Sequence, residues 1–257
     1  MGVNDLITQI SDPYERKARL WPALLVIFPP IVTLELLYGS RISTWTNVVM
    51  LAASCGGFYL LASVCRERGK RLEPKLYEAW GGKPTTQLLR HRNPFMDRVT
   101  KQRYHGVLEA KIKKQFPDQD QETSEPGNAD EIYQSAVSWL LRHTRDTTQS
   151  EFRLLFRENI SYGFRRNALG LKPFGLTICS CTILWILVAY GVVNGSASHL
   201  LSPGALVKFP VTGVVSVGVS LFMLTMWMTF FTKASVRTAA FTYADTLLRC
   251  CEVFDQG

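Results

Sequence analysis

The hydrophobic residues of this chain gather in four long blocks. Each block is almost free of charge and about 20 residues long; the blocks are 20–39, 46–65, 174–193 and 211–232. A helix of that length rises roughly 30 Å, the hydrocarbon thickness of a bilayer. A charged stretch, 66–173, separates the second block from the third. The pattern predicts an all-α integral membrane protein whose four transmembrane helices form two hairpins flanking a helical insert.

Helical spacing of apolar residues continues in the polar parts of the chain. It predicts about four helices in the insert. These helices cover 72–80, 93–116, 129–145 and 150–167. The segment 117–128 reads PDQDQETSEPGN; because it is acidic and contains proline and glycine, we expect a flexible loop there. The tail, 233–257, keeps the same spacing in register with 211–232, which predicts a C-terminal cytosolic helix continuous with the fourth span.

The chain carries a net charge of +8, and nearly all of its lysines and arginines lie on one side of the predicted membrane. The only lysine or arginine residues in the connections 40–45 and 194–210 are Arg41 and Lys208. The positive-inside rule therefore predicts that the N-terminal segment 1–19, the insert and the tail are cytoplasmic. None of the 6 cysteines falls in an outer connection. Reduced cysteines and short outer loops suit a bacterial inner (plasma) membrane.

Several cations lie directly beside the predicted spans. They are Arg66, Arg68, Lys70, Arg71, Arg165 and Arg166. Positive charges in this position set topology and attract anionic lipid, so the lipid bilayer is their expected partner. The helix that carries the last two is also suited to lie flat on the membrane surface.

The first span contains two adjacent prolines, Pro29 and Pro30, followed by a carboxylate, Glu35. Each proline lacks an amide hydrogen, so the carbonyls four residues earlier lose their donors. Two interpretations of the prolines stay open: a static kink that improves packing, or a hinge whose freed carbonyls face a wet cavity. Glu35 either reaches the outer headgroups or lies on a polar path. In an assembly of several copies, a ring of Glu35 would favour cations.

Small residues recur at helical spacing in the second and fourth blocks. They are Ala53, Gly56, Gly57, Gly213, Ser216 and Ser220. Such residues let helix backbones approach closely. They predict that the spans bundle, within one chain or in a homo-oligomer.

The most distinctive stretch of the insert is EAWGGKPTTQLLRHRNP, residues 78–94. It combines a glycine pair with hydroxyls and positive or titratable side chains. These side chains are Lys83, Thr85, Thr86, Arg90, His91 and Arg92. One hypothesis is a site for a phosphate-bearing ligand, whether a nucleotide, a nucleic acid or an inositol-type lipid headgroup. The alternative is a helix ended by glycine, a turn, and a second helix with a solvated basic face. The spacing does not match a phosphate-binding P-loop.

Signatures of catalysis are weak. The four histidines, His91, His105, His143 and His199, lack the spacing of metal ligands. Asp97 with Glu109 and Lys111 superficially matches a nuclease pattern. In such nucleases the acidic residues lie on strands around a metal ion, whereas this segment has helical spacing. We therefore expect no enzyme activity, no cofactor and no metal.

Three functions follow as hypotheses. The first is an oligomeric membrane sensor or effector: a phosphate ligand or a cytosolic protein binds the insert and shifts the spans, with a cation leak as the output. The second is a non-enzymatic anchor or scaffold that recruits a cytosolic protein. An enzyme acting on lipid or nucleic acid ranks last. The layout alone is like that of many small prokaryotic membrane sensors and effectors, including those of antiphage defence, which is an analogy of architecture.

Overall fold

The computed structural model describes residues 12–39, 56–146, 149–193, 204 and 209–255. Within these residues the regular structure is entirely helical. The chain divides into two compact units. We call Met1–Leu72 with Gly163–Ser235 the membrane unit, and Glu73–Tyr162 with Val236–Gly257 the head unit.

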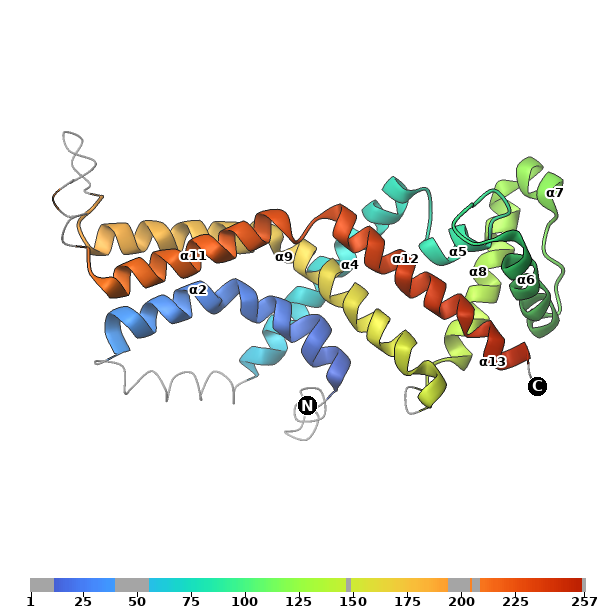
Figure 1. Ribbon diagram of the computed structural model, residues 1–257, viewed down its shortest axis with the longest axis horizontal. Helices are drawn as coiled ribbons and strands as arrows, with labels where there is room; N and C mark the ends of the chain where they lie inside the picture. Colours follow the sequence, from blue (N-terminus) through green and yellow to red (C-terminus); the bar gives the residue numbers. More distant parts are fainter. Residues whose placement is uncertain (1–11, 40–55, 147–148, 194–203, 205–208, 256–257) are drawn as a thin grey trace. The chain divides into compact units, whose positions relative to one another are not determined.

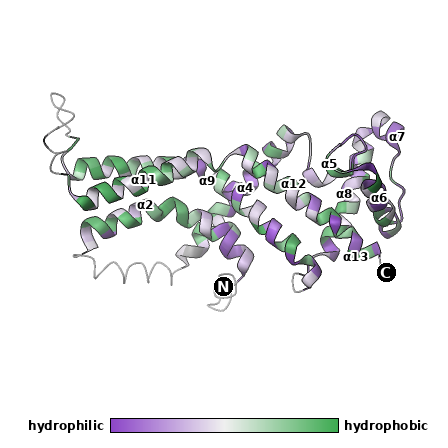
Figure 2. Cartoon of the chain, viewed as in Figure 1, coloured by the Kyte–Doolittle hydropathy of each residue, from purple (hydrophilic) through white to green (hydrophobic). Residues whose placement is uncertain are grey.

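Three helical stretches are long and apolar enough to cross a membrane. They are Glu15–Tyr38, Ser150–Ala189 and Val211–Thr229. The first comprises η1 (Glu15–Leu20) and α2 (Trp21–Tyr38), the second ends in α9 (Arg153–Ala189), and the third is α11 (Val211–Thr229). Hydrophobic residues dominate α2, α11 and the later half of α9 (Figure 2). Of the predicted second span, 46–55 lies outside the described residues, and 57–65 begins α4 (Gly57–Trp80).

The third predicted span belongs to a longer helix than the sequence predicts. The expected insert helix 150–167 and the expected span 174–193 merge into α9, which begins at Arg153 and passes through Pro173. A proline inside a helix removes one backbone hydrogen bond, here the one to the carbonyl of Leu169. The helix nevertheless continues, so Pro173 does not mark a boundary between two elements.

The prediction of one continuous helix from the fourth span into the tail was wrong. The chain leaves helical geometry after α11, at 230–232, and starts again as α12 (Lys233–Arg249) (Figure 1). Both new helix ends are satisfied. Lys172 Nζ donates to the carbonyls of Met228 and Phe231, at 3.0 and 3.1 Å. Thr232 Oγ1 accepts from the backbone N–H of Ser235 at 3.1 Å, as an N-cap does.

Close backbone approaches hold the membrane unit together. A Cβ added at Gly170 of α9 would lie 2.8 Å from the backbone carbon of Arg68 on α4, so only glycine allows these helices to cross here. Beside this crossing, the fully buried Asn167 donates to the carbonyl of Ala18 at 2.7 Å. The unit's core forms around these contacts. Its buried residues are Ala23, Val26, Cys65, Ala168, Leu171, Cys179, Met223, Trp227 and Phe231.

The head unit is built from short helices around one aromatic and aliphatic core. Its remaining elements are α5 (Pro84–Leu89), α6 (Arg98–Ile112), α7 (Gln119–Ser124), α8 (Pro126–His143), η3 (Ser150–Phe152) and α13 (Cys251–Asp255). α8 packs against α5, α6 and α7. The tail completes this core, because Leu247 and Leu248 of α12 are fully buried in the same cluster as Tyr104, Tyr133 and Leu140.

The segment 117–128 is not the flexible loop that its composition predicts. It contains α7 and the first turn of α8. The reason is a capping box: the Asp118 carboxylate accepts from the N–H of Gln121, and the Gln121 side chain accepts from the N–H of Asp118. Glu122, 4% exposed, then turns inward and accepts from the Tyr133 hydroxyl at 2.8 Å.

Candidate ligand-binding site

A cavity of about 300 Å³ lies within the head unit. Five helices contribute to its wall: the end of α4, the start of α5, the middle of α8, α9 near its start, and α12. The lining residues are Glu73, Tyr77, Lys83, Pro84, Thr85, Thr86, Gln134, Val137, Ser138, Leu141, Tyr162, Ala240 and Tyr243. The lining therefore combines polar and apolar side chains.

A carboxylate and two phenols form the polar centre of the cavity. Tyr77 and Tyr162 both donate to Glu73 Oε1, at 2.9 and 2.7 Å, and their own hydroxyl oxygens lie 3.2 Å apart. Tyr77 and Glu73 are four residues apart on α4, whereas Tyr162 belongs to α9. The ring of Tyr162 stacks nearly parallel on Tyr243 of α12, with centroids 6.2 Å apart. This cluster therefore ties three helices together at the cavity wall.

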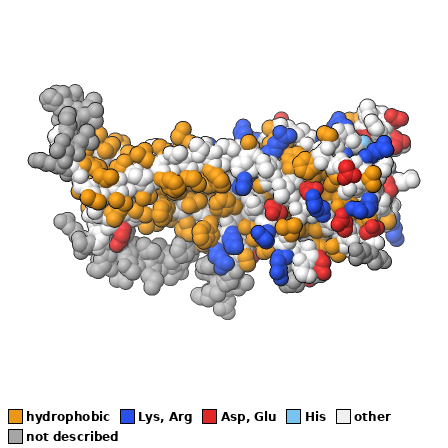
Figure 3. Space-filling model, viewed as in Figure 1, with side chains coloured by type: hydrophobic (Ala, Val, Ile, Leu, Met, Phe, Trp, Pro, Cys, Tyr) orange, Lys and Arg blue, Asp and Glu red, His pale blue; other side chains and the backbone are white. Residues whose placement is uncertain are grey.

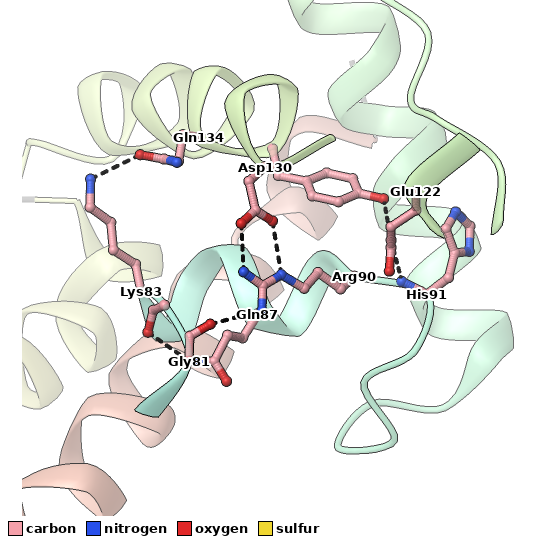
Figure 4. A network of polar contacts seen from close by, with 10 residues as sticks. Gly81, Lys83, Gln87, Arg90, His91, Glu122, Asp130 and Gln134 are labelled. Atoms are coloured by element: carbon pink, nitrogen blue, oxygen red, sulfur yellow. Dashed lines mark hydrogen bonds and ion pairs between the residues drawn. The ribbon is translucent and has the colours of Figure 1, made fainter. Parts of the chain in front are cut away.

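Lys83 supplies the cavity's positive charge. Its Nζ donates to Gln134 Oε1 of α8 at 3.1 Å (Figure 4). Thr85 is half-buried beside it, and Thr86 is 2% exposed. The Thr86 Oγ1 has no hydrogen-bond partner among the described residues. A buried hydroxyl left unpaired costs roughly 1–3 kcal/mol, so this position is one that a bound ligand could improve.

Arg90 does not belong to the cavity. Its guanidinium forms a two-point contact with Asp130 of α8, with Nε at 2.8 Å from Oδ1 and Nη2 at 2.5 Å from Oδ2 (Figure 4). Its Nη1 donates to the carbonyl of Gly81 at 2.9 Å. The hydrogen bonds that Arg90 donates to the Asp130 carboxylate raise the pKa of Arg90. Arg90 therefore links the turn at Gly81 and Gly82 to α8 through hydrogen bonds.

His91 and Arg92 diverge from the same turn. The backbone N–H of His91 donates to Glu122 Oε2 at 2.8 Å, and its Nε2 lies 2.9 Å from the carbonyl oxygen of Pro117. The side chain of Arg92 is exposed. The six residues predicted to hold phosphate are thus not brought together: Lys83, Thr85 and Thr86 share the cavity, and the other three lie elsewhere.

A second cavity, of about 260 Å³, lies beside His91, and the buried polar groups that line it have a structural role. One of its lining residues, Lys101, is 4% exposed and donates its Nζ to the carbonyls of Arg90 and Asn93, at 2.8 and 2.6 Å. Another, His105, bonds through Nε2 to the carbonyl of Leu89 at 2.8 Å. Burial lowers the pKa of Lys101 and lowers that of His105 to about 4. These buried groups hold the turn between α5 and α6.

The residues singled out in the first span lie on different faces of α2. Pro29 is buried, whereas Glu35 is exposed on the surface of the chain. α2 continues as a helix through both Pro29 and Pro30. Thr33, one turn beyond Pro29, is fully buried, and its hydroxyl has no partner among the described residues. A path lined by Glu35 would therefore form between chains rather than inside one.

The predicted packing residues also differ in their surroundings. Gly213, Ser216 and Ser220 are buried on α11. Gly56 has a φ of 82°, which suits the turn before α4, and a Cβ added there would meet nothing within 4 Å. Gly57 is half-buried at the start of α4. Ala53 lies outside the described residues.

The basic residues beside the spans fall into two groups. Arg66, Arg68, Lys70 and Arg71 are exposed along α4. Among them, Arg71 donates to Glu67 at 2.9 Å, and the Arg68 guanidinium lies 4.5 Å from the centre of the Phe174 ring. The other two are less exposed and also make contacts within the unit. Arg165 donates to the Ser235 hydroxyl at 2.9 Å, and Arg166, 8% exposed, contacts the side-chain oxygen of Asn167.

Sequence reasoning missed the most polar part of the cavity, which consists of Glu73, Tyr77 and Tyr162. Glu73 and Tyr77 carry a detectable signal, because residues four apart share one face of a helix. Tyr162 carries none, since it lies 89 positions from Glu73 along the chain.

Among the described residues, no group of three or more histidine, cysteine, aspartate or glutamate side chains is arranged to hold a metal ion. No family model matches the chain, and neither the curated proteins nor the solved structures include a significant match to it.

Proposed function

We propose that this chain is a membrane-embedded sensor or effector, in which a ligand bound in the head-unit cavity controls the packing of the spans. The single observation that carries this proposal is that the residues at the polar centre of the cavity come from two helices that also cross in the membrane unit. Glu73 and Tyr77 belong to α4, and Tyr162 belongs to α9. These same two helices contribute Arg68 and Gly170 to the close crossing in the membrane unit.

A ligand that competes for the Glu73 carboxylate would disturb the hydrogen bonds between α4 and α9. α4 and α9 each run as one helix from the cavity residues to the crossing residues, with Pro74 inside α4. Through these helices, a change in spacing or rotation at the cavity would reach the crossing. Gly170 makes the crossing sensitive, because the two backbones have no room to slide closer there. Ligand binding would therefore bias the arrangement of the spans.

The charges of the cavity define the class of ligand. The cavity offers one ammonium, Lys83, and one carboxylate, Glu73, together with hydroxyls and an apolar wall. A compact zwitterion fits this pattern: its phosphate or carboxylate would pair with Lys83 and Thr85, and its ammonium with Glu73. A nucleoside triphosphate fits less well, because about 300 Å³ is at the lower end of ligand-pocket volumes and Glu73 repels extra negative charge.

Isothermal titration calorimetry on the purified full-length protein tests the ligand class. The probes are O-phosphoethanolamine, inorganic phosphate and ethanolamine. We expect the zwitterion to bind more tightly than either half, and both Lys83→Gln and Glu73→Gln to weaken its binding at least ten-fold. Arg92→Gln and Glu78→Gln alter exposed charges outside the cavity and serve as matched controls. Failure of all three probes to bind at millimolar concentration would reject the zwitterion assignment.

We propose a cation leak between assembled copies as the output, with Glu35 on its path. The exposed position of Glu35 on α2 supports a path between chains. A voltage-sensitive dye in bacteria expressing the full chain measures this output. Glu35→Gln should abolish depolarisation and leave probe binding and assembly intact. Tyr162→Phe should change depolarisation without altering Glu35 or the residues of the α4–α9 crossing. If the wild-type protein does not depolarise cells with or without O-phosphoethanolamine, the leak is wrong.

One observation favours the scaffold as a second candidate. In the head unit, Phe95 is 58% exposed and Val99 is 75% exposed, and Phe95 lies beside Phe241 with ring centroids 6.0 Å apart. Exposed apolar clusters of this kind often mark protein contacts. In a scaffold, a Phe95→Ser, Val99→Ser variant would lose a specific cytosolic partner in pull-downs, while Glu35→Gln would have no phenotype.

A further inference from the structure

The net charge of the chain is confined to one unit. Lysines plus arginines equal aspartates plus glutamates in the head unit, so the full +8 belongs to the membrane unit. This division is unexpected for the more apolar unit, because a charge beside hydrocarbon is costly unless water or a counter-ion neutralises it. The excess cations of the membrane unit therefore need either water or an external source of negative charge beside them.

Some cations of the membrane unit lie close in sequence to exposed apolar side chains. Arg66 of α4 is two positions after Val64, which is 53% exposed, and Lys172 of α9 is two positions before Phe174, which is 39% exposed. Trp21, 54% exposed, begins α2 directly after η1. This alternation of aromatic or aliphatic surface with cations is typical of the boundary between hydrocarbon and headgroups. On the face drawn in Figure 3, Lys and Arg side chains are nearly absent from the hydrophobic surface at the left and appear from its end onward.

Part of this positive charge is engaged within the unit. Lys172 caps α11, Arg165 bonds to Ser235, and the Arg68 guanidinium lies 4.5 Å from the centre of the Phe174 ring. A second set of side chains is directed to the surface. It comprises the exposed residues Arg16 and Lys17 of η1 with Arg66, Lys70 and Arg71 of α4, which we call the basic belt. Within the belt, Arg71 also donates to Glu67 at 2.9 Å, in an exposed ion pair on the same helix.

We propose that the basic belt binds the headgroups of anionic phospholipids. A bilayer presents phosphodiesters at the depth where the apolar surface ends, and each cation held near an anionic surface contributes about 1 kcal/mol, or about five-fold in affinity. A soluble polyanion would meet the same charges but would gain nothing from Trp21 or Val64. This site is separate from the head-unit cavity and does not depend on the function proposed for it.

Native mass spectrometry of the full-length protein, purified in mixed micelles of phosphatidylglycerol and phosphatidylcholine, measures the preference. The test variant is Arg66→Gln, Lys70→Gln, Arg71→Gln. The matched control is Arg92→Gln, Lys111→Gln, Lys114→Gln, which removes three exposed cations from the head unit instead. We expect the enrichment of bound phosphatidylglycerol to fall at least ten-fold in the test variant and less than two-fold in the control.

Two measurements on the wild-type protein keep the proposal testable if the variant is not recovered. Raising the salt from 0.1 to 1 M shortens the screening length from about 10 to about 3 Å, so the enrichment should fall steeply. A short RNA should compete for the belt less well than phosphatidylglycerol micelles of equal charge. Equal loss of enrichment in both triple variants, no preference in the wild type, or full competition by RNA would each overturn the proposal.

Discussion

Arg90 offers a direct test of what the basic stretch of the head unit does. If Arg90 recognises phosphate, replacing it should abolish ligand binding and leave the stability of the head unit unchanged. If it fastens the glycine turn to α8, its removal should destabilise the unit. The contacts with Asp130 and with the carbonyl of Gly81 favour the second result.

The size of the effect follows from burial. The side chains of Arg90 and Asp130 are 11% and 27% exposed, between the limits of a surface pair and a buried one. Surface pairs contribute about 0–1 kcal/mol, and removing one partner of a buried pair costs about 3–5 kcal/mol. We expect Arg90→Ala to lower the free energy of unfolding of the head unit by about 2–3 kcal/mol, or its Tm by roughly 10 °C.

Thermal unfolding of the full-length protein in detergent, followed by circular dichroism, gives this number. Arg92→Ala is the matched control, because Arg92 lies two positions away, carries the same charge and is exposed. Asp130→Asn completes a double-mutant cycle, in which the two losses should not add. If Arg90→Ala unfolds within 2 °C of the wild type and of Arg92→Ala, the structural role of this pair is refuted.

Three further predictions concern other buried groups, each read from thermal unfolding in detergent. Burial lowers the pKa of His105 from its ordinary 6.5 to about 4, so as the pH falls this side chain takes up a proton in the unfolded chain before it does so in the folded protein. The free energy of unfolding should therefore fall by up to about 3 kcal/mol between pH 6.5 and pH 4, and by less in His105→Gln. Thr86→Val removes an unpaired hydroxyl and should leave the Tm unchanged or raise it, whereas Thr144→Val breaks the bond to Leu140 and should lower stability by about 1 kcal/mol. Gly170→Ala should cost about 2 kcal/mol because the Arg68 backbone is in the way, whereas Gly218→Ala, with nothing within 4 Å, should be neutral or slightly stabilising; equal effects of the two glycine changes would contradict the close crossing.

The hydrophobic blocks were the most predictable part of this protein. The cost of burying a helix in hydrocarbon depends on the residues of that helix alone, so composition suffices to find it. The stretches ending at Tyr38, Ala189 and Thr229 are long and apolar enough to span, as the sequence predicts. The start of α9 was harder, because Pro173 resembles a boundary in the sequence while the surrounding helix tolerates it.

The acidic segment 117–128 shows what composition misses. Its polarity indicates a loop, but Asp118 and Gln121 stand three residues apart and close a capping box. That signal was present in the sequence. The inward turn of Glu122 was not, because it depends on Tyr133 and on the backbone of His91, which reach it only in the folded unit.

The same limit applies to charge. The sequence places many cations in 66–114, which suggests lipid contacts for those beside the span and a phosphate-ligand site within 78–94. In the head unit the acids that balance them come from later in the chain: Asp130 pairs with Arg90, and Glu252 with Arg103. In the membrane unit the balancing acids are missing from the sequence itself. The unbalanced charge of the membrane unit is the basis of the anionic-lipid contact proposed for α4 and η1, whereas Arg90 and Arg103 of the head unit are paired with acids of the same unit.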